Sequence, residues 1–169
     1  MAVVDDFHDF VVHRSPALSR TAYLLTCDHQ LAEDLLQSAL AETYRHWRRV
    51  RLGNPEAYVR RAMYHQHVSW WRRRRLTERL EPSPVEGADA DPSDATVLRL
   101  SVAAMLRRLT PRQRAVIVLR YYEDLTEVQV AEVLGCTIGT VKRHGHDAVR
   151  MLRTIAPELV DTTPAESPR

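Results

Sequence analysis

The sequence has few cysteines and no long apolar segment. No apolar run approaches the roughly 18 residues of a membrane-spanning helix, and the first ten residues, MAVVDDFHDF, carry acids where a signal peptide has basic residues. Cys27 and Cys136 lie far apart and neither belongs to a CxxC pair, so neither a disulfide framework nor a thiolate zinc site is expected. We expect a cytoplasmic protein without membrane insertion, in which both cysteines are small buried residues.

Catalytic and metal-binding patterns are also missing. The chain has eight histidines, but the pairs His65/His67 and His144/His146 are two residues apart. On a helix such residues point about 200° away from each other, so neither pair can chelate a metal ion. No nucleophile–base signature, glycine-rich phosphate loop or pair of catalytic carboxylates stands out. The sequence therefore predicts no metal site, no cofactor and no enzymatic activity.

The formal net charge of +2 conceals an uneven distribution of charge. Residues 45–79 hold eleven arginines against two acids, whereas residues 81–97 hold five acids and no base. The basic stretch includes VSWWRRRR at 68–75, in which two tryptophans precede four arginines. A membrane interface, an acidic protein and a nucleic acid are the three candidate partners. Four successive arginines cover every face of a helix, which disfavours the membrane surface.

The acidic stretch divides the chain into two units. EPSPVEGADADPSDA combines proline, glycine, serine and aspartate without apolar periodicity, which is typical of a linker. Both flanking units show helical periodicity, and no strand-like alternation competes with it. We predict an all-α fold with two small domains joined by a flexible acidic linker, the second domain being a helix-turn-helix. The predicted ranges are 1–80, a linker at 81–97, 98–156, and a tail at 157–169.

Two helices are predicted in the first unit. Apolar residues recur at helical spacing between Leu31 and Val50, and the polar face opposite carries Asp34, Gln37, Ala41, Arg45 and Arg48. The apolar positions are Leu31, Leu35, Leu36, Ala39, Leu40, Tyr44 and Trp47. The second helix is predicted to begin after Asn54 as N-cap, with Pro55 in its first turn, and to run into the arginines.

The second unit has strong helix-start signals. Thr110 and Thr126 each stand three residues before a glutamine, the pattern of a capping box. Gly135 is placed to end the middle helix in the left-handed conformation, and Thr137 to cap a third helix. The first of these helices is expected to run through RAVIVLRYY. Two helices joined by a tight turn that contains glycine are typical of a helix-turn-helix.

The third helix has two chemically distinct faces on a helical wheel of about 100° per residue. The inward positions are Ile138, Val141, Gly145, Ala148, Val149 and Leu152, and Gly145 suggests close packing against the preceding helix. The outward positions are Thr140, Arg143, His146, Asp147 and Arg150, with Lys142 and His144 on the flanks. Such side chains can read base edges in a major groove. The alternative is a solvated face with an Asp147–Arg143 ion pair.

These residues, in this order, resemble an extracytoplasmic-function sigma factor, the smallest class of the sigma-seventy family of bacterial transcription initiators. AEDLLQSALAETYRHWRRV resembles the family's core-binding segment, NPEAYVRRAMYHQHVSWWRRRR its promoter-melting segment, and LTPRQRAVIVLRYYEDLTEVQVAEVLGCTIGTVKR its helix-turn-helix. The WWRRRR ending is most similar to the actinobacterial branch. The resemblance covers nearly the whole chain and implies promoter-specific transcription initiation through −10 and −35 elements.

The resemblance implies several partners. Core RNA polymerase would bind through the clamp helices of its largest subunit and the flap of its second-largest subunit. In the family the clamp helices contact the polar face that here carries Asp34, Gln37, Ala41, Arg45 and Arg48. The acidic linker would run through the polymerase cleft, although a plain spacer is an equal alternative. Many members are held by an anti-sigma factor, but no residue identifies one here.

The resemblance assigns the −10 element to the second helix. Single-stranded DNA favours a cationic groove with aromatic surfaces, because each stacked base contributes roughly 1–3 kcal/mol. Trp70 shares a stripe with Val59 and Met63 and is expected in the core, whereas Trp71 is expected on DNA. Relatives commonly carry asparagine where this chain has His65, which leaves the preferred base open. The implied set is Asn54, Arg60, Arg61, His65, Ser69, Trp71, Arg72, Arg73, Arg74 and Arg75.

The resemblance assigns the −35 element to the third helix. KRHGHDAVR replaces the more usual KSxxSRAxxR, so the −35 sequence does not follow from relatives. A stand-alone helix-turn-helix regulator, binding duplex operator DNA as a dimer, is the alternative function. The arginine-rich melting segment argues against it. The implied −35 set is Thr137, Thr140, Lys142, Arg143, His144, His146, Asp147 and Arg150.

Overall fold

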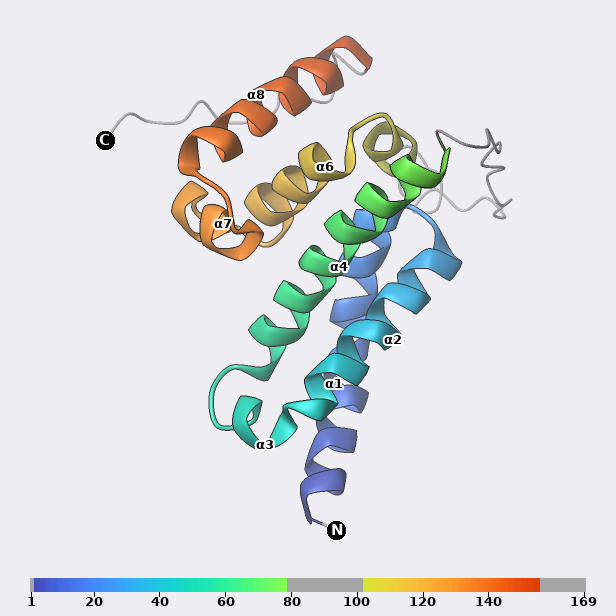
Figure 1. The fold of residues 1–169 in the computed structure, drawn as a ribbon, viewed down its shortest axis with the longest axis vertical. Coiled ribbons are helices and arrows are strands. Elements are labelled where there is room, and N and C mark those ends of the chain that lie inside the picture. Colours follow the sequence, from blue (N-terminus) through green and yellow to red (C-terminus); the bar gives the residue numbers. More distant parts are fainter. Residues whose placement is uncertain (1, 79–101, 156–169) are drawn as a thin grey trace.

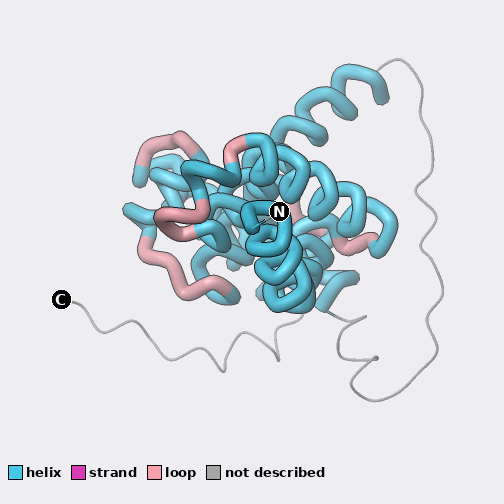
Figure 2. Tube along the Cα trace, turned by 90° about the horizontal axis from the view of Figure 1, so that it is seen from below, coloured by secondary structure: helices cyan, strands magenta, loops and turns pink. Residues whose placement is uncertain are grey.

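A computed structural model describes residues 2–78 and 102–155, and within these ranges every regular element is helical (Figures 1 and 2). The side chains of residues 2–5, 71–72 and 74–78 lie outside the described residues, as do the predicted linker at 81–97 and the tail at 157–169. The all-α prediction is confirmed. Over the described ranges no helix is long and apolar enough to cross a membrane. The labelled helices are α1 (Ala2–Thr26), α2 (His29–Arg45), α3 (Trp47–Val50), α4 (Pro55–Glu78), α6 (Pro111–Ile117), the π-helix η1 (Val118–Tyr122), α7 (Glu127–Leu134) and α8 (Ile138–Ile155). Residues 102–107 are also helical.

Helices α1, α2 and α4 form the first unit. Leu18, Leu25, Leu35 and Met63 are fully buried between them. At the far end of α1, the ring of Phe7 lies 5.0 Å from that of Trp47, edge-on. Because α1 packs along both other helices, it completes a core that two helices alone could not close.

The predicted helix over 31–50 is two helices in the structure. Helix α2 begins after Asp28, whose carboxylate accepts a hydrogen bond from the Leu31 backbone N–H at 2.8 Å. It ends at Arg45, because His46 leaves helical geometry with φ −108° and ψ 9°. This break allows Trp47 to enter the core at 3 % exposure. Tyr44, predicted on the apolar face, is instead 49 % exposed.

Helix α4 begins as the sequence predicts. The Asn54 side chain accepts a hydrogen bond from the Ala57 N–H at 3.0 Å, and Pro55 occupies the first turn, where no N–H is required. Val59 and Met63 are fully buried, and Trp70 packs against the same cluster. The placement of Trp70 in the core is therefore confirmed.

The helix-turn-helix also follows its local signals. Both capping boxes are present, with the Thr110 and Thr126 hydroxyls accepting from the backbone N–H three residues on. Gly135 ends α7 at φ 62°, and the Thr137 hydroxyl accepts from the Thr140 N–H at 3.2 Å, capping α8.

The predicted helix through RAVIVLRYY changes type part-way. Helix α6 ends at Ile117, and residues Val118–Tyr122 continue as a π-helix. Its wider turn is visible in the Glu123 N–H, which donates to the Val118 carbonyl at 3.0 Å. The prediction of one α-helix was therefore wrong at its C-terminal end.

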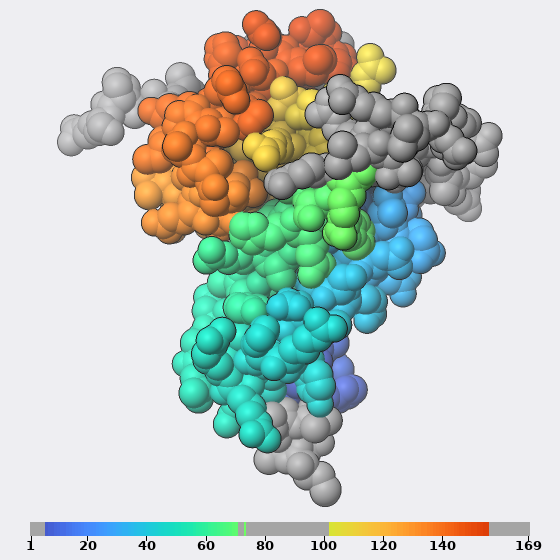
Figure 3. Space-filling model, in the orientation of Figure 1, coloured from blue at the N-terminus to red at the C-terminus, as the bar shows by residue number. Residues whose placement is uncertain are grey.

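The two units share one core and are joined by arginines. Leu119 and Val130 of the second unit belong to the same buried cluster as the first unit, and α7 lies beside α4 (Figure 3), as does α6. Arg114 donates to the carbonyls of Leu25 at 2.9 Å and Thr26 at 3.4 Å, where α1 ends. Arg107 donates to the Cys27 carbonyl at 2.6 Å. Two cations of the second unit thus satisfy carbonyls at the end of α1 and directly after it.

Candidate polymerase and promoter-binding surfaces

The predicted polymerase-binding face lies on the surface of α2 and α3. All five of its residues are exposed. Two make contacts within their own helix: Asp34 accepts from Gln30 at 3.4 Å, and Arg45 pairs with Glu42 at 3.4 Å. Both contacts, one hydrogen bond and one ion pair, are solvent-exposed and weak, so the side chains can rearrange on a partner at little cost. The complete face is Asp34, Gln37, Ala41, Arg45 and Arg48.

An apolar groove of about 620 Å³ borders this face, between α1 and α2. Gln37 and Ala41 form part of its lining, together with Phe7, Tyr23 and Tyr44. The sequence reasoning missed the α1 side of this surface. A signal for this helix was present in the sequence, because apolar residues recur at helical spacing in the first 26 residues. They are Phe7, Phe10, Val11, Leu18, Ala22 and Leu25.

Helix α4 distributes the predicted −10 residues over several environments. Arg61 and His65 are exposed, and Ser69 is half-buried. Asn54 uses its carbonyl oxygen to cap α4, which leaves its NH₂ group for other partners. Arg73 is exposed, and the side chains of Trp71, Arg72, Arg74 and Arg75 lie outside the described residues.

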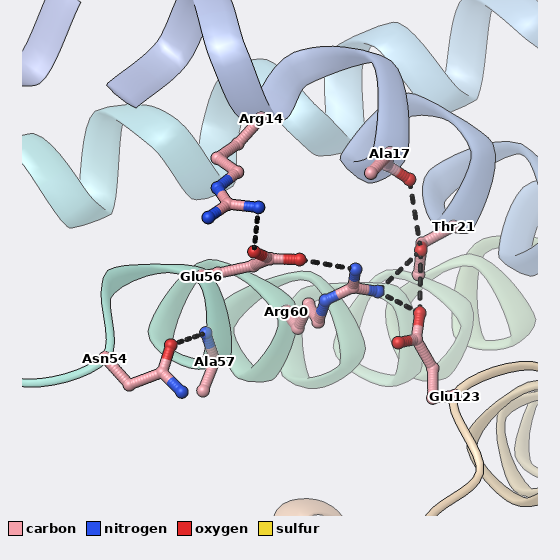
Figure 4. Close-up of polar contacts among 8 residues, drawn as sticks. All are labelled: Arg14, Ala17, Thr21, Asn54, Glu56, Ala57, Arg60 and Glu123. Carbon is pink, nitrogen blue, oxygen red and sulfur yellow. Dashed lines mark hydrogen bonds and ion pairs between the residues drawn. The ribbon is translucent and has the colours of Figure 1, made fainter. Parts of the chain in front are cut away.

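Arg60 lies between the two units and not on the open surface. Its guanidinium donates to Glu56 at 2.7 Å, to the Thr21 hydroxyl at 2.9 Å, and to the carboxylate of Glu123 from the second unit (Figure 4). Its side chain is 19 % exposed. Burial opposes its charge, but the Glu56 hydrogen bond and the two carboxylate charges outweigh this and raise the pKa of Arg60 above its ordinary value. In this arrangement Arg60 is therefore engaged by protein carboxylates, where the sequence predicted DNA phosphates.

The predicted recognition helix, α8, exposes Lys142, Arg143, His146 and Arg150. Asp147 pairs with Arg150 at 3.5 Å. The alternative raised from the sequence paired Asp147 with Arg143 instead; the Arg143 side chain is exposed. Across the parts of the chain that the structure describes, no group of three or more His, Cys, Asp or Glu side chains could hold a metal ion.

The inward face of α8 is narrower than the helical wheel predicted. Val141 and Ala148 are buried. Ile138 is 41 % exposed, because the first turn of α8 lies at the edge of the core. A Cβ added to Gly145 would lie 3.6 Å from Val116 of α6, an ordinary contact. The expected neighbour was the preceding helix, α7, so that expectation was wrong.

One cavity brings the two predicted DNA-binding surfaces together. It has a volume of about 180 Å³ and is lined by His65 and Ser69 of α4 and by Thr140 and His144 of α8. Arg112 of α6 also lines it, a cation that the sequence reasoning did not select. Burial and neighbouring arginines lower the pKa of both histidines. Both are therefore neutral near pH 7, and a neutral imidazole carries one donor and one acceptor.

Comparison with known proteins agrees with this organisation. The model of sigma-70 region 2 matches residues 10–77, and that of sigma-70 region 4 matches residues 99–152. The RNA polymerase sigma-E factor of Streptomyces coelicolor is 39 % identical over 160 residues, which cover 90 % of this chain and 87 % of the relative. The chain belongs to the sigma-70 family.

Further relatives place the chain in the extracytoplasmic-function (ECF) class of this family. The ECF RNA polymerase sigma factor SigL of Mycobacterium tuberculosis is 33 % identical over 156 residues, 84 % of each chain. These relatives agree with the predicted actinobacterial branch. A similar fold occurs in the co-crystal structure of the sigma factor RpoE with the anti-sigma factor NepR from Bartonella quintana. The TM-score is 0.70 at 24 % identity, covering 90 % of this chain and 98 % of that chain.

Proposed function

We propose that this sigma-70 family member binds core RNA polymerase and directs transcription initiation from promoters with −10 and −35 elements. The observation that carries the proposal is the order of matches, region 2 followed by region 4, in one chain whose second unit is a fully capped helix-turn-helix. The catalytic chemistry belongs to the polymerase, and the protein acts in the cytoplasm, where polymerase works. The working boundaries of the two domains are 1–80 and 98–156, with the linker at 81–97 and the tail at 157–169.

The polymerase would bind across α2 and the groove beside it. The groove supplies apolar area around Phe7 and Tyr44, and the charged rim supplies orientation through Arg45 and Arg48. Protein interfaces commonly combine an aromatic centre with a polar rim in this way. In the proposed complex the clamp helices of the largest subunit occupy this surface, and the second unit contacts the flap of the second-largest subunit.

The −35 element would be read by α8 in the major groove. Exposed side chains over the first half of α8 and its N-cap are those of Thr137, Lys142, Arg143 and His146. The N-terminal part of a recognition helix is the part that contacts base edges. Arg143 has the chemistry to bind guanine through O6 and N7. The rest of the proposed surface is Thr140, His144, Asp147 and Arg150.

The −10 element would be held along α4. Arg61 and His65 are exposed there, next to the arginine run that begins at Arg72. Neutral His65 would select a base by hydrogen bonding, whereas the arginines neutralise phosphates without reading sequence. The remaining members of this proposed surface are Asn54, Arg60, Ser69, Trp71, Arg73, Arg74 and Arg75.

A charge-reversal pair tests the polymerase face. Arg48→Glu reverses a charge on the proposed face, and Arg49→Glu makes the same change one residue away, at another exposed position of α3. We expect Arg48→Glu to weaken binding to purified core polymerase about tenfold, which corresponds to about 1.4 kcal/mol, and Arg49→Glu to leave it within twofold. Fluorescence anisotropy of the labelled protein gives both affinities. Equal effects of the two substitutions would contradict the assignment.

A further inference from the structure

A cluster of polar side chains between the two units binds Arg60, a residue of the proposed −10 surface. Arg60 of α4 and Glu123, which follows η1, are 63 residues apart and form a direct ion pair (Figure 4). The Thr21 hydroxyl of α1 donates to the same Glu123 oxygen at 2.8 Å. On the other side, Glu56 binds Arg60 at 2.7 Å and Arg14 at 3.3 Å.

The Arg60–Glu123 pair at the centre of this cluster is largely shielded from water. The side chain of Glu123 is 12 % exposed, that of Arg60 is 19 % exposed, and Thr21 is fully buried. An ion pair in such a place is screened much less by salt than a surface pair. Removing Arg60 leaves the Glu123 charge largely buried without its cation, which is unfavourable, whereas removing the Glu123 charge leaves Arg60 paired with Glu56 alone. The pair therefore favours the packed arrangement of the two units as long as both charges are present.

The packed arrangement also brings proposed DNA-binding residues of both units together. His65 and Ser69 share one cavity with Thr140 and His144. The −10 and −35 elements are about 25 base pairs apart, a separation of about 85 Å at about 3.4 Å per base pair. Surfaces that border one cavity cannot bind two elements at that separation. The units must therefore separate before a promoter is engaged.

We propose that Glu123 is a latch that occupies Arg60 in place of a DNA phosphate and holds the two units closed. Its carboxylate supplies oxygen acceptors and negative charge, the features that a phosphate offers to a guanidinium. When the units separate, Arg60 keeps Glu56, which lies on the same helix, and the Nη1 donor that Glu123 occupied becomes available to the −10 strand. This inference rests on the proposed assignment of α4 to the −10 element.

The first experiment measures the closed state without DNA. Glu123→Gln keeps the shape of the side chain and removes its charge. Glu132→Gln removes the same charge from an exposed position on α7 and is the matched control. Thr21→Val, which deletes the bridging hydroxyl, is a second route to the same weakening. Far-UV circular dichroism verifies that each variant retains its helices.

Small-angle X-ray scattering of the full chain then reports whether the units separate. A compact chain of 169 residues has a radius of gyration of about 15 Å. We expect the wild type and Glu132→Gln to give the same radius, and Glu123→Gln and Thr21→Val to give larger ones. An unchanged radius in a helical Glu123→Gln variant would overturn the latch, whatever the protein does with DNA.

The second experiment measures competition with DNA. The probe is a fluorescein-labelled single-stranded 12-nucleotide DNA of random sequence, so no promoter has to be known. If the open fraction rises tenfold, the apparent dissociation constant falls tenfold, and we expect about that gain for Glu123→Gln over Glu132→Gln. Adding Arg60→Gln to Glu123→Gln should remove the gain.

The two experiments separate the latch from its functional premise. Expansion of Glu123→Gln together with tighter binding that depends on Arg60 supports the whole proposal. Expansion with unchanged DNA affinity would overturn the competition between Glu123 and phosphate. If every variant fails to bind DNA although Glu123→Gln expands, the assignment of α4 to DNA is overturned, and the latch itself is supported.

Discussion

Replacement of Arg114 tests how the two units are held together. Arg114 is 3 % exposed, and its guanidinium donates to the carbonyls of Leu106 at 2.8 Å, Leu25 at 2.9 Å and Leu109 at 3.3 Å. Each hydrogen bond from a charged donor contributes about 1.5–3 kcal/mol. Burial opposes the charge and lowers the pKa of Arg114, so desolvation offsets part of that sum.

Arg114→Ala leaves these carbonyls buried without donors and removes the side chain that fills the space between them. We expect it to lower the free energy of unfolding by about 3–5 kcal/mol. With a urea m-value of about 2 kcal/mol per molar, the midpoint falls by about 2 M. Equilibrium unfolding in urea, followed by circular dichroism at 222 nm, measures this directly.

Arg112→Ala is the matched control, because Arg112 is exposed on the same helix, α6. It should change the free energy of unfolding by less than about 0.5 kcal/mol, as is usual for surface substitutions. A loss below about 1 kcal/mol for Arg114→Ala would show that its hydrogen bonds do not hold the carbonyls of α1, and would refute the reasoning.

Four further predictions follow from single positions. Gly135→Ala should destabilise the protein by about 1–2 kcal/mol, because Gly135 has φ 62°; Gly145→Ala should stabilise it by about 1 kcal/mol, because the new methyl group meets its neighbour at an ordinary 3.6 Å. Urea unfolding checks both signs. Burial and a nearby arginine lower the pKa of His67 to about 3, below the roughly 6.5 of an unfolded histidine. The unfolded state therefore binds the proton first, and the free energy of unfolding, full above about pH 6.5, should fall by about 2 kcal/mol between pH 7 and pH 5. His67→Gln should lose less over the same range, and an equal loss would contradict the assignment. Arg143→Ala should cost about 1–3 kcal/mol and relax the preference at one −35 position, while Arg153→Ala leaves it intact. Sequencing a bound promoter library measures that preference.

Local chemistry made much of the fold predictable. Thr110, Thr126 and Asn54 fix where helices begin, because a capping side chain and the N–H groups that it accepts from are only a few residues apart. Gly135 marks where α7 ends for a similarly local reason. Trp70 was placed correctly from its spacing to buried neighbours.

The elements that were missed depend on packing between distant residues. The break at His46 exists because Trp47 turns into a pocket that α1 provides, and the sequence near His46 contains no proline or glycine to announce it. The π-helical turn at Val118–Tyr122 likewise has no local signal.

The candidate site shows the same limit. Exposure of Arg45, Arg48 and Arg143 followed from helical periodicity, because each lies opposite an apolar stripe. The pairing of Arg60 with Glu123 could not be predicted from the sequence, because a charge pattern does not say which of many acids will lie beside a given arginine. Contacts of that kind are decided by the packing of whole helices, in this case α4 against α6 and α7.

The most direct test of the account is transcription in vitro from a random promoter library, using purified core polymerase with and without the protein. The account predicts RNA starts that appear only when the protein is present and that share two upstream elements at fixed spacing, the −10 motif showing which base His65 selects. If the protein adds no starts but binds duplex sites from the same library without polymerase, the account is contradicted and the protein is a stand-alone regulator.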